Sequence, residues 1–439
     1  MSARETALRA LAACRKDGAW SNSVLKEYTQ QQRLDRRDAA LAARLCYGVL
    51  QNQMLLDFYL KQYLSGRLRD LHPMVRDILH LGLYQLYWMD KIPASAAVNE
   101  SVALAKKYCR SQRNAPGLVN AVLRSAIRGK DTRKEPDILS VQYSHPQALL
   151  DVLADSVGKH RLEPMLRANN AIAPTVIQVN TLRTTTAQLL QLLEQEGVTA
   201  RMHSWLPDCL VLTSTGNLEQ LDTFQKGLFY VQNAAARLSV LCAQLPVQTG
   251  LQVLDCCAAP GGKSFAAAIA TQGKGQIRSC DIYPHKTELI KKGAQRLGLD
   301  SVSVFCHDAT VEEPQWLEKM DAVIADVPCS GYGIIRKKPD IRYKDPASMA
   351  QLPALQMQIL KQQAKYVRPG GVLLYSTCTL VRAENEGVVQ AFLESRPDFY
   401  LERLPLPEPL REDSTGMLML VSGEYDTDGF FICRLRRKQ

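Results

Sequence analysis

The stretch Asp255-Cys-Cys-Ala-Ala-Pro-Gly-Gly-Lys-Ser264 decides the fold of the C-terminal part of the chain. Small residues and two glycines between a strand and a helix allow a ligand to approach the backbone at the helix N-terminus. The stretch has neither the Gly-x-Gly-x-x-Gly spacing of dinucleotide sites nor the spacing of phosphate-binding loops. Lys263 falls in the first turn of the expected helix, where a cation opposes the helix dipole. We therefore expect Lys263 to face a ligand or a carboxylate partner.

Strands and helices alternate on both sides of this turn. The predicted strands are Gln252–Asp255, Gln276–Cys280, Val302–Phe305, Ala322–Asp326 and Val372–Tyr375. Helical patterns lie between them, notably at His285–Leu297 and Leu352–Val367. This alternation predicts a doubly wound, mostly parallel α/β sheet of the Rossmann-like type.

Acidic residues follow three of these strands. Asp281 lies 19 residues after Gly262, where a carboxylate can accept hydrogen bonds from ribose hydroxyls. Asp308 follows the third strand and Asp326 closes the fourth. A single acid at such a place is more often a turn or cap residue, but the carboxyl ends of parallel strands face one crevice. The pattern indicates a nucleoside ligand without a polyphosphate, which suits S-adenosylmethionine.

Two cysteines also lie at strand ends. Cys329 is in Asp326-Val-Pro-Cys and Cys378 is in Ser376-Thr-Cys. The chain has 12 cysteines but no Cys-x-x-Cys pair, which argues against a zinc module, a thioredoxin-type site and a disulfide scaffold. So many scattered thiols suit a reducing cytoplasm. Most buried cysteines are inert packing, but these two are expected to open into the ligand crevice.

Two thiols, an acid and a methyl donor suit one reaction in particular. Carbon 5 of cytosine is a poor nucleophile, and a thiolate that adds to carbon 6 turns the ring into an enamine that accepts a methyl group at carbon 5. An acid near ring nitrogen 3 helps as charge develops there. The thiolate requires a lowered thiol pKa. Arg336-Lys-Lys338 is a hypothetical source of that positive charge, and contact with backbone phosphates is the alternative interpretation.

The N-terminal third of the chain has a helical pattern and a surplus of basic residues. Apolar residues recur at four-residue spacing, as in Leu41, Leu45 and Val49, and predict helices. Residues 1–144 hold 23 Lys and Arg against 13 Asp and Glu, whereas the rest of the chain holds 31 of each. A surplus confined to one third suggests a polyanionic partner, although a solvated helical surface explains it as well. The polar stretch 128–136 is predicted to be a linker.

A small module is expected between these two parts. Strand-like runs at Thr175–Asn180, Asp208–Thr213 and Gly227–Gln232, with a weaker one at Val198–His203, alternate with helical patterns near Thr186–Glu196 and Asn217–Phe224. This order predicts a split α/β unit of the βαββαβ type.

Length and composition agree with a multidomain globular protein. The chain has 439 residues, of which 46% are apolar and 22% charged. No apolar run approaches the length of a membrane helix, and the N-terminus lacks an apolar export signal. We therefore expect a cytoplasmic protein without a membrane partner.

These motifs resemble those of the RNA cytosine-5 methyltransferases of the Nol1/Nop2/Sun family. The resemblance rests on Cys257–Lys263, Asp326-Val-Pro-Cys329, Ser376-Thr-Cys378, Glu384-Asn-Glu386 and Asp428-Gly-Phe-Phe431. Ile92–Glu100 and Leu118–Leu123 resemble the NusB RNA-binding fold. The combination implies an all-α NusB-like domain at 1–135, a small α/β module at 136–240 and a Rossmann-like methyltransferase domain at 241–439. It also implies 16S ribosomal RNA as the substrate.

The resemblance assigns roles to individual residues. It makes Cys378 the nucleophile, Cys329 the group that assists release, and Asp326 a contact of the cytosine and the cofactor region. DNA cytosine-5 methyltransferases instead attack with the cysteine of Pro-Cys, so the second thiol favours RNA. The implied S-adenosylmethionine contacts are Cys257, Ala258, Ala259, Pro260, Gly261, Gly262, Lys263, Asp281, Asp308 and Asp326. We expect no metal, and a monomer.

One segment departs from the family and two other functions stay open. Gln232-Asn-Ala-Ala-Ala236 replaces the usual Gln-Asp-x-Ala-Ser, which puts a structural or cofactor-side contact in question. A non-catalytic RNA-binding factor would keep the NusB-like domain without methyl transfer. An adenine-N6 methyltransferase favours Asn/Asp-Pro-Pro-aromatic where this chain has Asp-Val-Pro-Cys.

Overall fold

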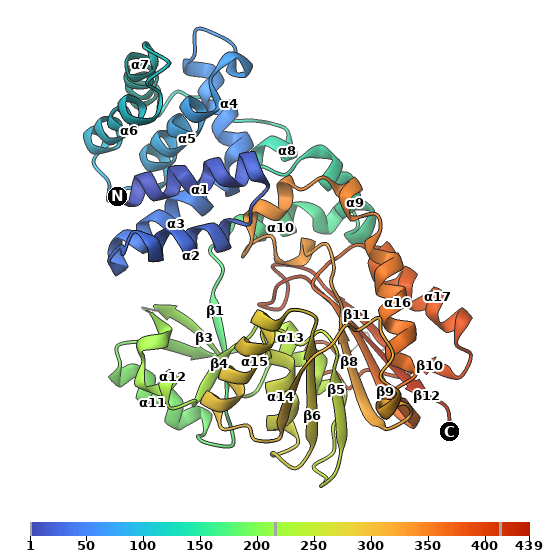
Figure 1. The fold of residues 1–439 in the computed structure, drawn as a ribbon. Helices are drawn as coiled ribbons and strands as arrows, with labels where there is room; N and C mark the ends of the chain where they lie inside the picture. Colours follow the sequence, from blue (N-terminus) through green and yellow to red (C-terminus); the bar gives the residue numbers. More distant parts are fainter. Residues whose placement is uncertain (1, 215–216, 412–414) are drawn as a thin grey trace. The chain divides into compact units, whose positions relative to one another are not determined.

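The computed structural model describes residues 2–214, 217–411 and 415–439. The chain divides into two compact units, whose elements are labelled in Figure 1. The first unit runs to Val152 and also contains Lys337–Lys344. The second unit comprises Leu153–Arg336 and Asp345–Gln439. The chain thus leaves the second unit eight residues after Cys329 and returns to it at Asp345.

The first unit is helical, as predicted. Its α-helices are α1 (Ala3–Asp17), α2 (Ser21–Gln31), α3 (Arg36–Gln51), α4 (Gln53–Tyr63), α5 (Pro73–Trp88), α6 (Ala94–Tyr108), α7 (Ala115–Arg128) and α8 (Leu139–Gln142), and its 3-10 helices are η1 (Leu68–Asp70) and η5 (Pro339–Tyr343). Local signals set their ends: the Asp35 side chain accepts a 2.8 Å hydrogen bond from the Asp38 amide at the start of α3. At the end of α1, Gly18 takes the left-handed conformation with φ +62°.

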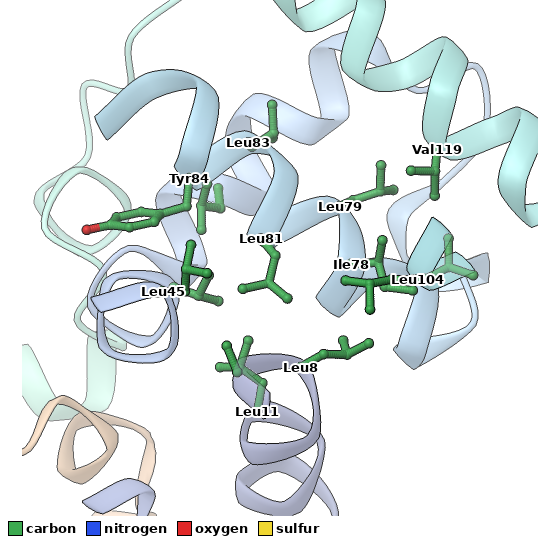
Figure 2. Close-up of a cluster of buried hydrophobic side chains, with 14 of the residues drawn as sticks. Leu8, Leu11, Leu45, Ile78, Leu79, Leu81, Leu83, Tyr84, Leu104 and Val119 are labelled. Atoms are coloured by element: carbon green, nitrogen blue, oxygen red, sulfur yellow. The ribbon is translucent and has the colours of Figure 1, made fainter. Parts of the chain in front are cut away.

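Aliphatic side chains fill the core of the first unit (Figure 2). Leu45 and Val49 on α3 and Leu79 on α5 are all buried and belong to this one cluster. The four-residue spacing of the sequence therefore marks the core face of these helices. Full burial of one such side chain stabilises the fold by roughly 1.5–3 kcal/mol, so this unit is held mainly by apolar burial.

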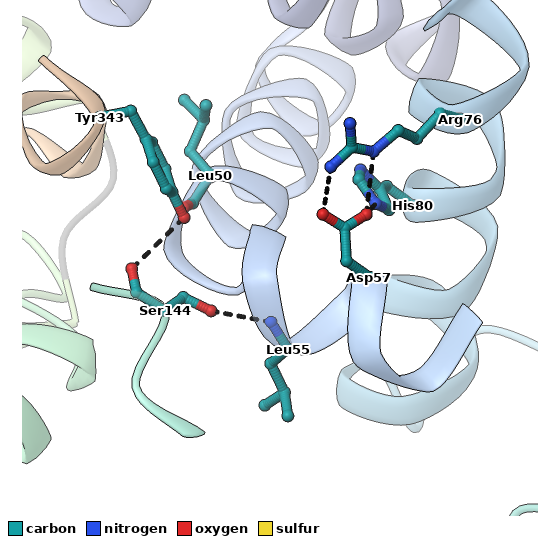
Figure 3. A network of polar contacts seen from close by, with 7 residues as sticks. All are labelled: Leu50, Leu55, Asp57, Arg76, His80, Ser144 and Tyr343. Atoms are coloured by element: carbon teal, nitrogen blue, oxygen red, sulfur yellow. Dashed lines mark hydrogen bonds and ion pairs between the residues drawn. The ribbon is translucent and has the colours of Figure 1, made fainter. Parts of the chain in front are cut away.

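A carboxylate bonded to an arginine and a histidine lies beside this core. Asp57 on α4 receives hydrogen bonds from Arg76 and His80 on α5 (Figure 3). Burial alone would raise the pKa of Asp57, but the hydrogen bonds and charges of His80 and Arg76 outweigh it and lower the pKa. The ionised carboxylate is therefore stabilised in the folded unit.

The returning segment Lys337–Lys344 is firmly anchored in the first unit. Arg342 in η5 is fully buried and donates from Nη1 to the carbonyl oxygens of Gln51, at 2.9 Å, and Tyr143, at 3.2 Å. The Tyr343 hydroxyl donates to the Leu50 carbonyl at 2.8 Å (Figure 3). The bonds to Gln51 and Leu50 cap carbonyls at the end of α3, and the bond to Tyr143 caps the end of α8.

The polar stretch 128–136 has no regular secondary structure beyond the end of α7, in agreement with its prediction as a connection. It nevertheless packs on the helices: the Tyr59 hydroxyl donates to Glu135, and the Arg133 guanidinium lies 4.9 Å from the centre of the Tyr87 ring. Residues 137–174 contain helices that were not predicted, namely α8, α9 (Gln147–Val157) and α10 (Lys159–Asn170).

The small module has the predicted order of elements. It contains β1 (Thr175–Val179), α11 (Thr186–Gln195), β2 (Thr199–Met202), β3 (Cys209–Ser214), η2 (Leu218–Gln220), α12 (Asp222–Gln225) and β4 (Phe229–Val231). Its four strands form an antiparallel sheet in the order β2-β3-β1-β4. Thr185 and Gln188 form a complete capping box at the start of α11. The prediction of a split βαββαβ unit is confirmed.

A larger sheet carries the candidate site. Its strands are β5 (Gln252–Asp255), β6 (Gln276–Asp281), β7 (Val302–Cys306), β8 (Met320–Asp326), β9 (Val367–Thr377), β10 (Phe399–Leu401), β11 (Met417–Leu420) and β12 (Phe430–Arg437). The order is β10-β12-β9-β8-β5-β6-β7, with β11 paired to β12. Strands β5 to β9 are parallel and all five were predicted, whereas β10, β11 and β12 are antiparallel and were not.

Separate clusters of buried side chains cover the two faces of this sheet. Val253 on β5 and Ile324 on β8 pack in one cluster with residues of α13 (Ala234–Leu241), α14 (Gly262–Ala270) and α15 (Pro284–Leu297). Their neighbours Leu254 and Val323 point the other way and pack with α16 (Leu352–Ala364) and α17 (Glu386–Ser395). Side chains alternate along a strand, so two-sided burial confirms the doubly wound architecture.

Candidate active site

A cavity of about 570 Å³ opens where the parallel strands of the second unit end. The predicted site residues that line it are Cys257, Ala259, Asp281, Asp308, Asp326, Cys329 and Cys378. The adjoining turn contains the other predicted residues, which are not among the lining: Ala258, Pro260, Gly261, Gly262 and Lys263. The loop after each of five neighbouring strands therefore contributes to one crevice.

The turn after β5 is shaped by glycine. Gly261 has φ +110° and is the N-cap of α14. A Cβ at Gly261 would lie 2.4 Å from the Phe265 ring, so a larger residue does not fit. The Ala258 amide donates to the Cys280 carbonyl at 2.8 Å, which fixes the turn against β6. The backbone consequently lies close to the cavity, as the small residues predict.

Two carboxylates face the cavity from the ends of β6 and β7. Asp281 is buried and accepts a hydrogen bond from the Tyr283 amide at 3.1 Å. Asp308 accepts from the Thr310 amide and hydroxyl at 2.8 and 2.7 Å, both through Oδ1. The backbone bond first, and then the hydroxyl bond, lowers the pKa of Asp308. Local hydrogen bonds therefore orient acceptor oxygens beside the cavity.

Lys263 has the carboxylate partner that its place in the helix implied. Its Nζ lies 2.6 Å from Oδ2 of Asp326, and the Ser376 hydroxyl donates to Oδ1 of the same carboxylate at 2.8 Å. Lys263 is 8% exposed, so this ion pair is partly shielded from water. Both oxygens of Asp326 are thus held while the residue lines the cavity.

The two cysteines meet although 49 residues separate them in the sequence. Cys329 follows β8 and Cys378 follows β9, and these strands are parallel neighbours. Their sulfur atoms are 3.3 Å apart, at hydrogen-bond distance. The hydrogen bond with Cys378, and then burial, raises the pKa of the Cys329 thiol well above its usual range; the charges of Cys378, Glu384 and Asp326 act in the same direction. Cys329 therefore keeps its proton, and that proton can be shared with the sulfur of Cys378.

Sequence reasoning missed a buried acid beneath the turn. Asp255 at the end of β5 is fully buried, and the Ser264 hydroxyl donates to it at 2.7 Å. Burial raises the pKa of Asp255 to about 7. A polar residue at the end of an otherwise apolar strand was the available signal.

A second network explains the departure at residue 233. Asn233 accepts a hydrogen bond from the Ala235 amide at 2.8 Å and donates to Asp428 at 2.7 Å. A carboxylate at this place would cap the helix equally well but has no proton to donate to Asp428. Asp428 also forms a 2.8 Å ion pair with Arg336. Arg336 is thus committed to Asp428 and does not line the cavity, contrary to the hypothesis that it folds over the thiols.

Within 2–214, 217–411 and 415–439, no three His, Cys, Asp or Glu side chains are grouped so as to hold a metal ion. No helix in the same ranges has the length and apolar character needed to cross a membrane.

Comparison with known protein families assigns all three parts of the chain. Residues 1–128 match the NusB family, and residues 145–219 match the ferredoxin-like domain of RsmF/B-like methyltransferases. Residues 242–436 match the family described as 16S rRNA methyltransferase RsmB/F. The last match contains the cavity, the turn and both thiols.

Individual proteins resemble the chain over its whole length. The probable ribosomal RNA small subunit methyltransferase B of Bacillus subtilis is 36% identical, over 100% of this chain and 99% of the relative. Ribosomal RNA small subunit methyltransferase B of Vibrio cholerae is 34% identical, over 93% of this chain and 92% of the relative. The crystal structure of PH0851 is 24% identical, covers 99% of this chain and 98% of its own, and has a TM-score of 0.80, which shows a shared fold. Because the Bacillus subtilis and Vibrio cholerae relatives are each more than 30% identical to the chain over at least 93% of its length, the chain belongs to the RsmB/F family of 16S rRNA methyltransferases.

Proposed function

We propose that the protein transfers a methyl group from S-adenosylmethionine to carbon 5 of a cytosine in 16S ribosomal RNA. The observation that carries the proposal is the pair of sulfur atoms 3.3 Å apart beside Asp326 at one cavity. A methyltransferase that acts on a nitrogen or an oxygen has no use for two thiols. Activation of carbon 5 needs one sulfur to add to the ring and a second group to accept the carbon 5 proton.

The cavity fits S-adenosylmethionine by its donor and acceptor groups. Asp281 and Asp308 offer carboxylate oxygens for ribose hydroxyls, and the turn Cys257–Lys263 lets the ligand lie against the backbone. When bound, S-adenosylmethionine supplies an electrophilic methyl group on a sulfonium sulfur. Asp326 places negative charge on the side of the cavity where the thiols and the turn meet.

The thiols divide the chemistry between them. The Cys378 thiolate adds to carbon 6, and the electron pair of the carbon 5–carbon 6 double bond then takes the methyl group at carbon 5 while the bond from that methyl group to the sulfonium sulfur breaks. Asp326, held by Lys263 and Ser376, hydrogen-bonds at ring nitrogen 3 while charge builds up there. Bonding of Cys378 to carbon 6 ends the hydrogen bond that is the first cause of the raised pKa of Cys329, and Cys329 then loses its proton to solvent. The Cys329 thiolate accepts the carbon 5 proton, the carbon 5–carbon 6 double bond re-forms, and the bond between Cys378 and carbon 6 breaks to return the Cys378 thiolate.

The RNA contacts are assigned to the basic part of the chain. The target base must leave its stack to enter the cavity, so a single-stranded loop or an opened helix is the expected substrate. The surplus of Lys and Arg in residues 1–144 supplies attraction to phosphates. The proposal also includes domain limits at 1–135, 136–240 and 241–439 and a monomeric state. It includes a cytoplasmic location, where ribosomal RNA is made and assembled.

The test is the identity of the product. Unmodified 16S ribosomal RNA is incubated with the full-length protein and S-adenosylmethionine, digested to nucleosides and analysed by mass spectrometry. 5-Methylcytidine is expected from the wild type and from Cys306→Ala, an exposed cysteine outside the cavity lining. N6-Methyladenosine, or no methylated nucleoside with either free RNA or assembling subunits, contradicts the proposal.

A further inference from the structure

The loops that carry the two thiols are held by two consecutive residues. Glu384 ends the 3-10 helix η7 (Arg382–Glu384), and Asn385 precedes α17. Both side chains are buried, with 3% and 0% of their surface exposed, and neither lines the cavity. They therefore touch the thiol loops from behind and are out of reach of a bound base.

Glu384 holds the loop of Cys329. Its Oε2 accepts a hydrogen bond from the Ser330 amide at 2.9 Å and a second from Nε2 of Gln356 at 2.9 Å. The same Gln356 nitrogen donates to the Pro328 carbonyl at 2.9 Å. The residues on both sides of Cys329 are thus fixed by one carboxylate and its amide partner.

Asn385 holds the loop of Cys378 in the same way. Its Oδ1 accepts from the Thr377 hydroxyl at 2.6 Å, and its Nδ2 donates to the Thr379 carbonyl at 3.1 Å. A direct bond joins the two loops, because the Ser330 and Thr379 hydroxyls are 2.7 Å apart. Each thiol therefore lies between two residues that the Glu384-Asn385 pair positions.

We propose that Glu384 and Asn385 are positioning residues that set the separation of the two thiols, Glu384 for release by Cys329 and Asn385 for attack by Cys378. The inference rests on the proposed function and deepens it. Because the two side chains grip different loops, loss of each one affects a different half of the reaction.

The experiment measures formation and release of the protein–RNA adduct separately. Formation is followed on denaturing gels in a Cys329→Ala background, where release is blocked, and release is followed as the adduct fraction in proteins that keep Cys329. Glu384→Gln removes one acceptor position while keeping size, and Asn385→Asp keeps the acceptor but removes the donor. Unmodified 16S ribosomal RNA and S-adenosylmethionine serve as substrates throughout.

Opposite outcomes are expected for the two variants. With Glu384→Gln, adduct accumulates about tenfold over wild type while its formation rate stays within about twofold of the background. With Asn385→Asp, formation slows by about tenfold and no adduct accumulates. Equal slowing of both steps by both variants, or no change in either, overturns the inference.

Controls distinguish the positioning roles from a general effect of losing a buried hydrogen bond and from failure of the proposed function. Gln362 lies on α16, as Gln356 does, and its Nε2 donates a buried hydrogen bond to the Tyr366 hydroxyl. Gln362→Ala removes that hydrogen bond and is expected to change neither step. If Glu384→Gln or Asn385→Asp does not fold, Gln356→Met removes the amide that donates to Glu384, and Thr377→Val removes the hydroxyl that donates to Oδ1 of Asn385. The same pair of outcomes is expected, because each change loosens the same loop. Absence of adduct in Cys329→Ala itself contradicts the proposed function, whereas adduct there without the split between variants contradicts only the positioning roles.

Discussion

Cys109 and Cys329 show how differently the two units are built. Cys109 lies in the helical core of the first unit among aliphatic side chains. Cys329 lies at the edge of a cavity on a loop that hydrogen bonds to Glu384 and Gln356 hold from both sides. Apolar packing tolerates a small change by local adjustment, whereas a single directed bond has no substitute. Changes of the same chemical kind should therefore cost stability in the first unit and chemistry in the second.

The largest contrast is expected from the cysteines themselves. Cys378→Ala removes the proposed nucleophile and should lower methyl transfer by at least about 1,000-fold. Cys109→Ala makes the same change in the helical core and should leave turnover within about twofold while lowering the unfolding midpoint. Initial rates of methyl incorporation into 16S ribosomal RNA measure both. Equal rates for the two variants would break the contrast.

Loss of a cation gives the next largest difference. Lys263→Met leaves Oδ2 of Asp326 without its partner, and we expect methyl transfer to fall by about 100-fold because Asp326 is no longer held. Arg15→Met removes the partner of Asp77 in the first unit, at 3.0 Å, and should change turnover by less than about twofold. Turnover with saturating RNA decides between them; a Lys263→Met protein as active as Arg15→Met contradicts the role of the ion pair.

The buried Asp255 and the half-buried Asp57 should give stability profiles of opposite sign. The folded-state pKa of Asp255 is raised from 3.8 to about 7, so the folded state binds more protons between these values and the stability from this group is lost as pH rises through that window. The effect is on the order of 2–4 kcal/mol, and Asp255→Asn should remove it.

The pKa of Asp57 is lowered, so its contribution is present above about pH 4 and is lost as pH falls below that value. Asp57→Asn should therefore flatten the acid side of the profile only. Urea unfolding between pH 3 and 8 measures both variants. A shared window for the two acids would show that burial acts alike in both units.

The smallest change is expected from surface charge. Arg33, Arg36 and Arg37 are exposed near the start of α3. Their replacement by Gln should weaken RNA binding and reduce the slope of log affinity against log salt by about 2, with turnover at saturating RNA unchanged. RNA affinity measured at several salt concentrations tests this. An unchanged slope would remove the electrostatic role of this cluster.

Much of the fold could be predicted because it follows local patterns. Strands β5 to β9 were found from short apolar runs, and the helices of the first unit from spacings such as that of Leu45 and Val49. β12 was missed because Arg434, Arg436 and Arg437 interrupt its apolar pattern, although the strand is central to the antiparallel edge of the sheet. Helix α10 was missed because polar residues fill much of it.

The site could be predicted in part, because strand order brings the ends of β8 and β9 together whatever the loops contain. A carboxylate partner for Lys263 was one of two alternatives that the helix dipole predicted. The roles of Glu384 and Asn385 were not predicted. The contacts of Glu384 span 28 and 54 residues and those of Asn385 span 8 and 6, and both sets depend on loop geometry that no periodic pattern encodes. The commitment of Arg336 to Asp428, 92 residues away, was missed for the same reason.

The central claim is that Cys378 attacks and Cys329 releases, and a denaturing gel tests it most directly. Wild type, Cys329→Ala, Cys378→Ala and the double variant are incubated with S-adenosylmethionine and unmodified 16S ribosomal RNA. A retarded protein–RNA band in Cys329→Ala alone, lost in the double variant, is the predicted result. A band in Cys378→Ala instead, or no band in any variant, would contradict the assignment of the two thiols.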